Sequence, residues 1–284
     1  MRGKKVRGFR KRVKEIEREL EKDKEKSKHL GRGMRFVEMG KWEEADREFE
    51  LALGFLKQEE KERFLGFLLM LDIGVATKTD EHKKVVNLVE YAMKIHRKLD
   101  DEHLIAFDLG ELGIRYVKLR KYDRAIECLC KAISMFVAEG NKRCEAELRE
   151  ELGNAYLEKR KLEKAAEEFQ KTLELRKMIP EIESEIVCHG NLGIIYGMQR
   201  KYEKALEHLN RAFELQKKIG DVAGTLPTHI NLGHAYSHIG EHSRAAKHYK
   251  RAMELASALK DYKTAAECGS WLEDEEEKLG GKEK

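Results

Sequence analysis

A 40-residue repeat organises most of this chain. The pattern Leu-Gly-x-x-Tyr occurs four times without gaps, at residues 112–116, 152–156, 192–196 and 232–236. Twelve residues after each glycine stands an alanine, and a large apolar or aromatic residue follows four positions later. A period of this length is typical of repeat proteins, in which each unit buries its apolar face against its neighbours because it cannot do so alone.

Two further units precede these four. Eighty residues before Gly113 stands Gly33, which is followed at the same distances by Phe36 and Ala45. The unit between them is degenerate, with Ile73 at the glycine position and Gly74 one residue late. The sequence therefore predicts six units, which span residues 26–65, 66–105, 106–145, 146–185, 186–225 and 226–265.

The residue types at the repeated positions indicate helical hairpins. Glycine and alanine let two antiparallel helices approach closely, and the larger side chains fill the space between successive hairpins. Charged residues make up 39% of the chain and it contains only 2 prolines, which also favours helix. We expect an all-α fold, a right-handed superhelix of six hairpins. A capping helix and acidic tail should follow at 266–284, with Cys268 and Leu272 facing the last unit and Glu273 to Glu277 solvated.

Turn-forming residues fall where hairpins should begin and end. Glycine ends a helix in the left-handed conformation, and Asp or Asn caps the next helix. The predicted turns between units include Asp100-Asp101, Gly140-Asn141 and Gly220-Asp221. The predicted turns inside hairpins are near Arg120-Lys121, Arg160-Lys161, Arg200-Lys201 and Gly240-Glu241.

These offsets resemble the Leu-Gly-x-x-Tyr and Ala-x-x-x-Phe-x-x-Ala pattern of tetratricopeptide repeats. The 40-residue unit, with Asn-Leu-Gly at 191–193 and 231–233, is similar to the long-repeat members of that superfamily. Those members include the Pins/LGN spindle adaptors, the kinesin light chains and the Tonsoku-like chromatin proteins. The resemblance covers residues 26–280 and implies an α-solenoid that acts as a scaffold or adaptor, holding a peptide or helix of another protein in its concave groove.

The resemblance also implies which residues line that groove, because the first helix of each unit faces the concave side. The expected groove residues are Phe67, Met70, Phe107, Ile114, Glu150, Glu151, Asn154, Asn191, Asn231, His234 and His238. The apolar ones suit an amphipathic helix, and the asparagines suit an extended backbone, since an amide both donates and accepts. The acids favour a basic or neutral peptide. In the alternative interpretation, Phe67 and Met70 are simply core residues of a helix buried all round.

Positive charge is concentrated at the start of the chain. Residues 1–30 hold 13 Lys or Arg against 6 Asp or Glu, whereas the rest holds 44 against 47. We expect a basic arm at residues 1–25, which includes Lys4, Lys5, Arg7, Arg10, Lys11 and Arg12. The arm is either a solvated helix that covers the first unit or a patch for nucleic acid or an anionic surface. An arm-driven, nucleic-acid-associated regulator is therefore the alternative function.

Chemistry of other kinds has little support in the sequence. His234 and His238 lie four apart on one helix face, but the nearby sequence offers no third zinc ligand or glutamate base, so we expect groove-lining histidines and no metal. Phosphate loops, nucleotide fingerprints and nucleophile motifs are absent, so neither an enzyme nor a cofactor is expected. The 5 cysteines form no regular framework, the first residues are not a secretory signal, and no long apolar run occurs. We expect a cytoplasmic or nuclear protein.

Overall fold

The computed structural model describes residues 28–29, 32–33, 35–36, 44, 47–48, 51, 82–98 and 100–280. The chain forms two compact units, Met1–Leu88 and Val89–Lys284. The described residues of the first unit are helical. Among them, His29 Nδ1 lies 2.6 Å from Glu48 Oε2.

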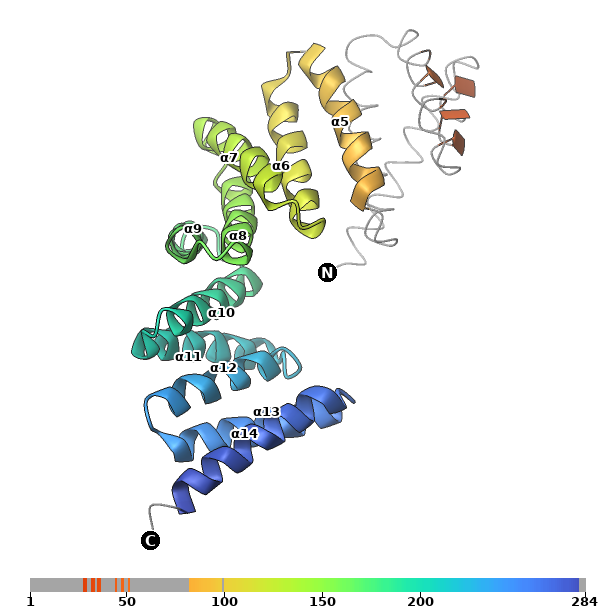
Figure 1. Ribbon diagram of the computed structural model, residues 1–284. Helices are drawn as coiled ribbons and strands as arrows, with labels where there is room; N and C mark the ends of the chain where they lie inside the picture. Colours follow the sequence, from red (N-terminus) through yellow and green to blue (C-terminus); the bar gives the residue numbers. More distant parts are fainter. Residues whose placement is uncertain are drawn as a thin grey trace. The chain divides into compact units, whose positions relative to one another are not determined.

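From residue 82 onward the described chain is a succession of helices that pair into hairpins (Figure 1). The helices are α5 (His82–Lys98), α6 (Glu102–Lys118), α7 (Tyr122–Glu139), α8 (Lys142–Glu158), α9 (Leu162–Arg176), α10 (Ile182–Met198), α11 (Tyr202–Ile219), α12 (Thr225–His238), α13 (His242–Ala258) and α14 (Tyr262–Gly280). The described residues include no strand, so the all-α prediction is confirmed. Among these helices, none combines the length and the apolar character needed to cross a membrane.

The predicted turns are confirmed, and their hydrogen bonds explain the residues found there. Asp101 accepts a hydrogen bond from Leu104 N at 3.0 Å and so caps the start of α6. Gly140 ends α7 with φ 71°, a left-handed conformation that glycine adopts without strain. Inside the hairpins, Arg120, Arg160 and Arg200 adopt the same conformation, with φ 57°, 58° and 59°. Each of these turns therefore holds a residue with a Cβ in a region that glycine prefers.

The Leu-Gly pairs lie where the two helices of a hairpin cross. A Cβ on Gly153 would come within 2.9 Å of the Phe169 ring, and one on Gly233 within 2.4 Å of the Tyr249 ring. The repeated alanines beside them are fully buried. Glycine is therefore required at these positions because an aromatic or leucine side chain of the second helix occupies the space.

Each joint between consecutive hairpins has its own buried side chain at the same repeat position. His96 and Asp108 form a fully buried pair with Nδ1 and Oδ2 2.6 Å apart. Forty residues later the position is Phe136, and eighty residues later it is Arg176, which is 2% exposed. In the next repeat the position is Gln216, whose side-chain oxygen accepts a hydrogen bond from the Thr228 hydroxyl at 2.9 Å. The buried side chain and its partner therefore differ from joint to joint, although the position in the repeat is the same.

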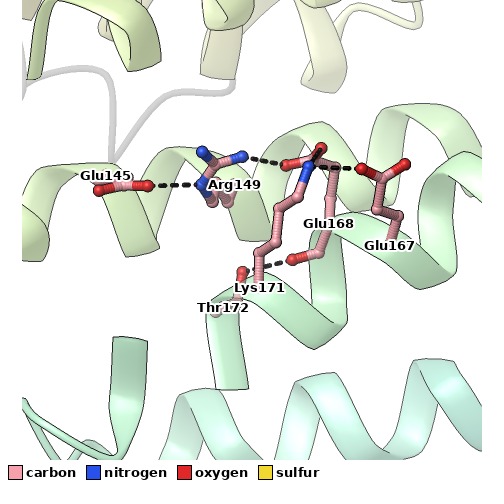
Figure 2. A network of polar contacts seen from close by, with 6 residues as sticks. All are labelled: Glu145, Arg149, Glu167, Glu168, Lys171 and Thr172. Atoms are coloured by element: carbon pink, nitrogen blue, oxygen red, sulfur yellow. Dashed lines mark hydrogen bonds and ion pairs between the residues drawn. The ribbon is translucent and has the colours of Figure 1, made fainter. Parts of the chain in front are cut away.

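A second repeated position joins the two helices of one hairpin, and its chemistry also changes along the chain. Arg149 of α8 lies 2.6 Å from Glu168 of α9, within a network that includes Glu145 and Lys171 (Figure 2). Forty residues later the corresponding residues are His189 and His208, with Nδ1 atoms 2.9 Å apart. In the next hairpin they are His229 and His248, again at 2.9 Å.

Helix α14 corrects one expectation about the C-terminal segment. Cys268 is fully buried, in line with the prediction, but Glu275 is also buried and 2% exposed, whereas the sequence suggested a solvated acid. The Glu275 carboxylate accepts hydrogen bonds from Ser237 at 2.7 Å and from Lys278 at 2.5 Å, and it lies 2.6 Å from His242 Nδ1. The carboxylate thus anchors α14 to α12 and α13. An acid inside a run of acids gave no signal of that role.

Candidate ligand-binding face

Four helices, α6, α8, α10 and α12, are the first helices of their hairpins and contact one another in that order. We call the surface that they share the first-helix face. Nine of the predicted groove residues lie on these helices; Phe67, Met70 and the basic-arm residues at 1–25 lie outside the described residues. Phe107 and His238 are exposed, and the other seven are half-buried. The nine are Phe107 and Ile114 on α6, Glu150, Glu151 and Asn154 on α8, Asn191 on α10, and Asn231, His234 and His238 on α12.

Phe107, at the start of the first-helix face, already contacts other rings of the chain. The Phe107 ring packs edge-on against Phe136, with centroids 5.0 Å apart, and against His103. Phe107 is nevertheless 41% exposed, so part of its ring is open to a ligand.

Glu150 is held by a buried polar chain between α8 and α10. Its carboxylate accepts a hydrogen bond from the Ser184 hydroxyl, and Ser184 Oγ in turn accepts a hydrogen bond from Arg176 Nε at 3.0 Å. Burial raises the pKa of Glu150, and Glu151 raises it further, while the bond from Ser184 lowers it. The adjacent Glu151 has one buried carboxylate oxygen without a hydrogen-bond partner among the described residues.

The asparagines differ from one another in a way that the repeat makes visible. Asn191 Nδ2 donates to Asn154 Oδ1 on the preceding first helix at 3.0 Å. Asn231 occupies the position of Asn191 one repeat later, but the residue in the place of Asn154 is Ile194, which has no polar side chain. Within the described residues, the Asn231 side chain forms no hydrogen bond. Asn231 is therefore a free amide at a position where its counterpart is bonded.

A hollow of about 280 Å³ lies beside that free amide, between α10 and α12. Its polar wall consists of Asn231, His234 and His238, and its apolar wall includes Ile194 and Met198, which are 36% and 39% exposed. An exposed apolar wall beside an unpaired amide suits a peptide, whose side chain takes the apolar part and whose backbone takes the amide.

The two histidines at the hollow are fixed by aromatic neighbours. His234 Nδ1 lies 2.8 Å from the Tyr249 hydroxyl, and its ring meets Trp271 edge-on at 4.6 Å. Burial lowers the pKa of His234, and His238 lowers it further. His238 stacks on Tyr202 with centroids 4.7 Å apart.

Sequence reasoning missed the apolar wall of this hollow. Ile194 stands at the same repeat position as the predicted groove residues Asn154 and His234, and Met198 stands at the position of His238. The signal was therefore present in the repeat, but these units also hold the asparagines, glutamates and histidines that mark them as polar. Tyr202, which lies beyond the inner turn, carried no such signal.

Comparisons with known proteins agree with the repeat. Two family models, both described as tetratricopeptide repeat, match the chain, one at residues 144–218 and 185–258 and the other at 110–136. No curated protein matches the sequence significantly.

Solved structures of similar fold include BtubC (BKLC) from P. vanneervenii, with 19% identity, a TM-score of 0.59, and coverage of 86% of this chain and 92% of that one. A putative kinesin light chain from Podosopora anserina has 18% identity and a TM-score of 0.57, over 69% of this chain and 96% of that one. A Rap protein complexed with competence and sporulation factor has 16% identity and a TM-score of 0.53, over 90% and 76%. At these identities the likeness concerns the fold.

Proposed function

The chain belongs to the tetratricopeptide repeat superfamily, and from that premise we propose that it is a protein-interaction scaffold that binds a peptide or amphipathic helix on its first-helix face. One observation carries the proposal: the unpaired Asn231 amide stands over a hollow with an apolar wall. The half-buried Asn231 amide makes no hydrogen bond within the described residues, so it can donate to and accept from the backbone of a ligand.

The surroundings of the hollow define the partner segment. Ile194 and Met198 offer an adaptable apolar contact, because a methionine side chain fits ligands of different shapes. Glu151, which has a carboxylate oxygen without a hydrogen-bond partner among the described residues, lies on the neighbouring α8 and favours a segment that is neutral or basic. A Rap protein of similar fold has been solved in complex with competence and sporulation factor, which supports a partner-binding role for this chain.

A glycine at the hollow gives the sharpest test. A Cβ at Gly197 would meet nothing within 4 Å, and Gly197 lines the hollow. Gly197→Leu should therefore fill the hollow without disturbing the core, and it should not lower thermal stability, since leucine is a better helix former by about 1 kcal/mol. Partners captured by the immobilised intact chain would be identified by mass spectrometry, and the bound segment would be measured by fluorescence anisotropy.

The two asparagines provide a matched pair of controls. Asn231→Ala should weaken binding of that segment by about tenfold, the value of one hydrogen bond of ordinary strength, and leave stability unchanged. Asn191→Ala should instead lower the melting temperature, because it leaves Asn154 without its partner. If the segment binds wild type, Gly197→Leu and Asn231→Ala with equal affinity, the hollow is not the binding site.

The alternative function depends on the basic arm rather than on this face. The excess of Lys and Arg in residues 1–30 favours it. Binding of nucleic acid or an anionic surface through the arm would weaken steeply as salt is raised, whereas binding in an apolar hollow would not. Deletion of residues 1–14 separates the two functions, since it should abolish only the salt-sensitive binding.

A further inference from the structure

A second cleft lies elsewhere on the last hairpin, and it shares no lining residue with the hollow between α10 and α12. Its volume is about 520 Å³, and it is bordered by α11, α12 and α13. Aromatic rings form one part of its lining, namely Phe213, His229, Tyr236 and His248. Basic side chains of α13 form the other part, namely Arg244, Lys247, Lys250 and Arg251.

Two of these cations have no counter-ion among the residues that the structure describes. Glu254 is the acid in the lining, and its Oε2 lies 2.9 Å from Arg251 Nη1. Arg244 lies over the Tyr236 ring at 5.6 Å and is 3.9 Å from Glu241. Lys247 and Lys250 form no ion pair within the described residues. The two lysines are three residues apart on one helix, so they lie on neighbouring positions of the same face.

The preceding hairpin shows that this charge is particular to the last one. Forty residues before Lys247 and Lys250 stand Glu207 and Asn210, while Arg211 and Glu214 occupy the positions of Arg251 and Glu254. The tyrosine and the histidine pair are also the same in both hairpins. The replacement of an acid and an amide by two lysines therefore changes the charge of an otherwise similar surface by three.

The pKa values of the neighbouring histidines reflect this difference in charge. Burial lowers the pKa of His248, and Lys247 lowers it further. Burial also lowers the pKa of the corresponding His208, but there Glu207 acts in the opposite direction and raises it. The cleft of the last hairpin thus has a net positive charge, because Glu254 offsets only one of its four cations.

We infer that this cleft binds an acidic segment of a protein partner, with Lys247 and Lys250 contacting its carboxylates. The rings at the cleft already contact other groups, which disfavours single-stranded nucleic acid as the ligand. Tyr236 has His248 stacked at 5.4 Å and Arg244 at 5.6 Å, and His229 meets Phe213 edge-on at 4.9 Å. A nucleic-acid base would have to displace one of these contacts in order to stack on a ring. The carboxylates of a protein segment need only to pair with the lysines.

The preceding hairpin supplies the test variant. Lys247→Glu with Lys250→Asn gives the last hairpin the residues that Glu207 and Asn210 provide one repeat earlier, so the fold should tolerate the change. The probe is a fluorescein-labelled peptide of alternating Glu and Ser, measured by anisotropy on the full chain at low salt. We expect wild type to bind it, the double variant to lose about tenfold or more in affinity, and a peptide with Gln for Glu not to bind.

Two further variants make the result specific. Lys118→Glu with Lys218→Asn makes the same change in net charge at exposed sites outside the cleft, and it should leave the affinity unchanged. Glu207→Lys with Asn210→Lys should add a second binding equivalent on the preceding hairpin, a gain that misfolding cannot produce. Equal binding by wild type and Lys247→Glu with Lys250→Asn would overturn the inference. So would an equal loss in the control variant, or tighter binding of a single-stranded oligonucleotide of the same charge.

Discussion

His189 and His208 face each other across the hairpin formed by α10 and α11, with their Nδ1 atoms 2.9 Å apart. At that distance one ring must donate and the other must accept, so at most one of the two Nδ1 atoms carries the shared proton. One repeat earlier the same contact is an ion pair between Arg149 and Glu168 (Figure 2). The same backbone thus carries either a pair of imidazoles or an ion pair, according to two residues.

The histidine pairs predict a loss of stability in mild acid. Burial, then the partner histidine, then Arg211 lower the pKa of His189 from 6.5 to about 4, and the same kinds of cause lower that of His229 to about 4. A histidine whose pKa is lower in the folded state favours the fold above pH 6.5, and this contribution is lost as the pH falls toward 4. The melting temperature should therefore fall over that range.

The preceding hairpin offers a variant that removes part of this dependence. His189→Arg with His208→Glu places the Arg149–Glu168 pair in the next repeat, where Glu185 and Arg211 already stand at the positions of Glu145 and Lys171. The double variant should lose less stability between pH 6.5 and 4, and the His229–His248 pair should supply the remaining loss. Melting curves at several pH values would decide, and identical profiles for the two proteins would contradict the assignment.

The glycines of the repeat should respond very differently to substitution. Gly153→Leu forces a side chain into the space of the Phe169 ring and should destabilise by about 3 kcal/mol or more. Gly140→Ala meets nothing within 4 Å and costs only the left-handed conformation, at φ 71°, which is about 1 kcal/mol. Urea unfolding midpoints in the reverse order would show that Gly153 is not at a packed crossing.

The inner turns predict a stabilising substitution. Arg160 ends its helix at φ 58°, in the conformation that Gly240 adopts at φ 79° in the last hairpin. Arg160→Gly should raise the unfolding midpoint, by up to about 1 kcal/mol in free energy, because glycine relieves the left-handed strain. Gly240→Arg should lower it by a similar amount. If both variants shift stability in the same direction, the backbone conformation is not the cause.

Glu275 should be required for docking of the last helix. Burial alone would raise its pKa, but hydrogen bonds from Lys278, Ser237 and His242 outweigh burial and lower the pKa to about 2. Glu275→Gln should destabilise the folded chain by about 1–3 kcal/mol at pH 7, as expected for hydrogen bonds to a charged group. A lowered carboxyl pKa stabilises the fold fully above pH 4.5 and progressively less as the pH falls toward 2, so the difference from wild type should shrink over that range. The neighbouring exposed Glu276→Gln is the control, with no expected effect.

Much of the fold could be predicted because the same pattern of packing and turn residues recurs in several units. Each Leu-Gly pair fixes a helix crossing, and each Gly-Asn or Gly-Asp pair fixes a turn, so the errors of a single reading average out over the units. The hydrogen bonds of the surface residues could not be predicted in this way, because they differ from one unit to the next. Asn191 and Asn231 are the same residue at the same position, yet only Asn191 is bonded, because its partner Asn154 on the preceding first helix is replaced by Ile194 one repeat later.

The sequence by itself determined the hairpins, their turns and the face on which ligands are expected, since those features follow from local periodicity and residue size. Only the tertiary structure decided which polar groups satisfy one another. Glu275 is buried because Ser237, 38 residues earlier, reaches it, and Glu150 is occupied because Ser184, 34 residues later, donates to it. Such pairs depend on how one hairpin is seated on the next, a relation between distant residues that no local pattern contains. The free amide of Asn231 and the unbalanced lysines of α13 stand out only against those satisfied neighbours.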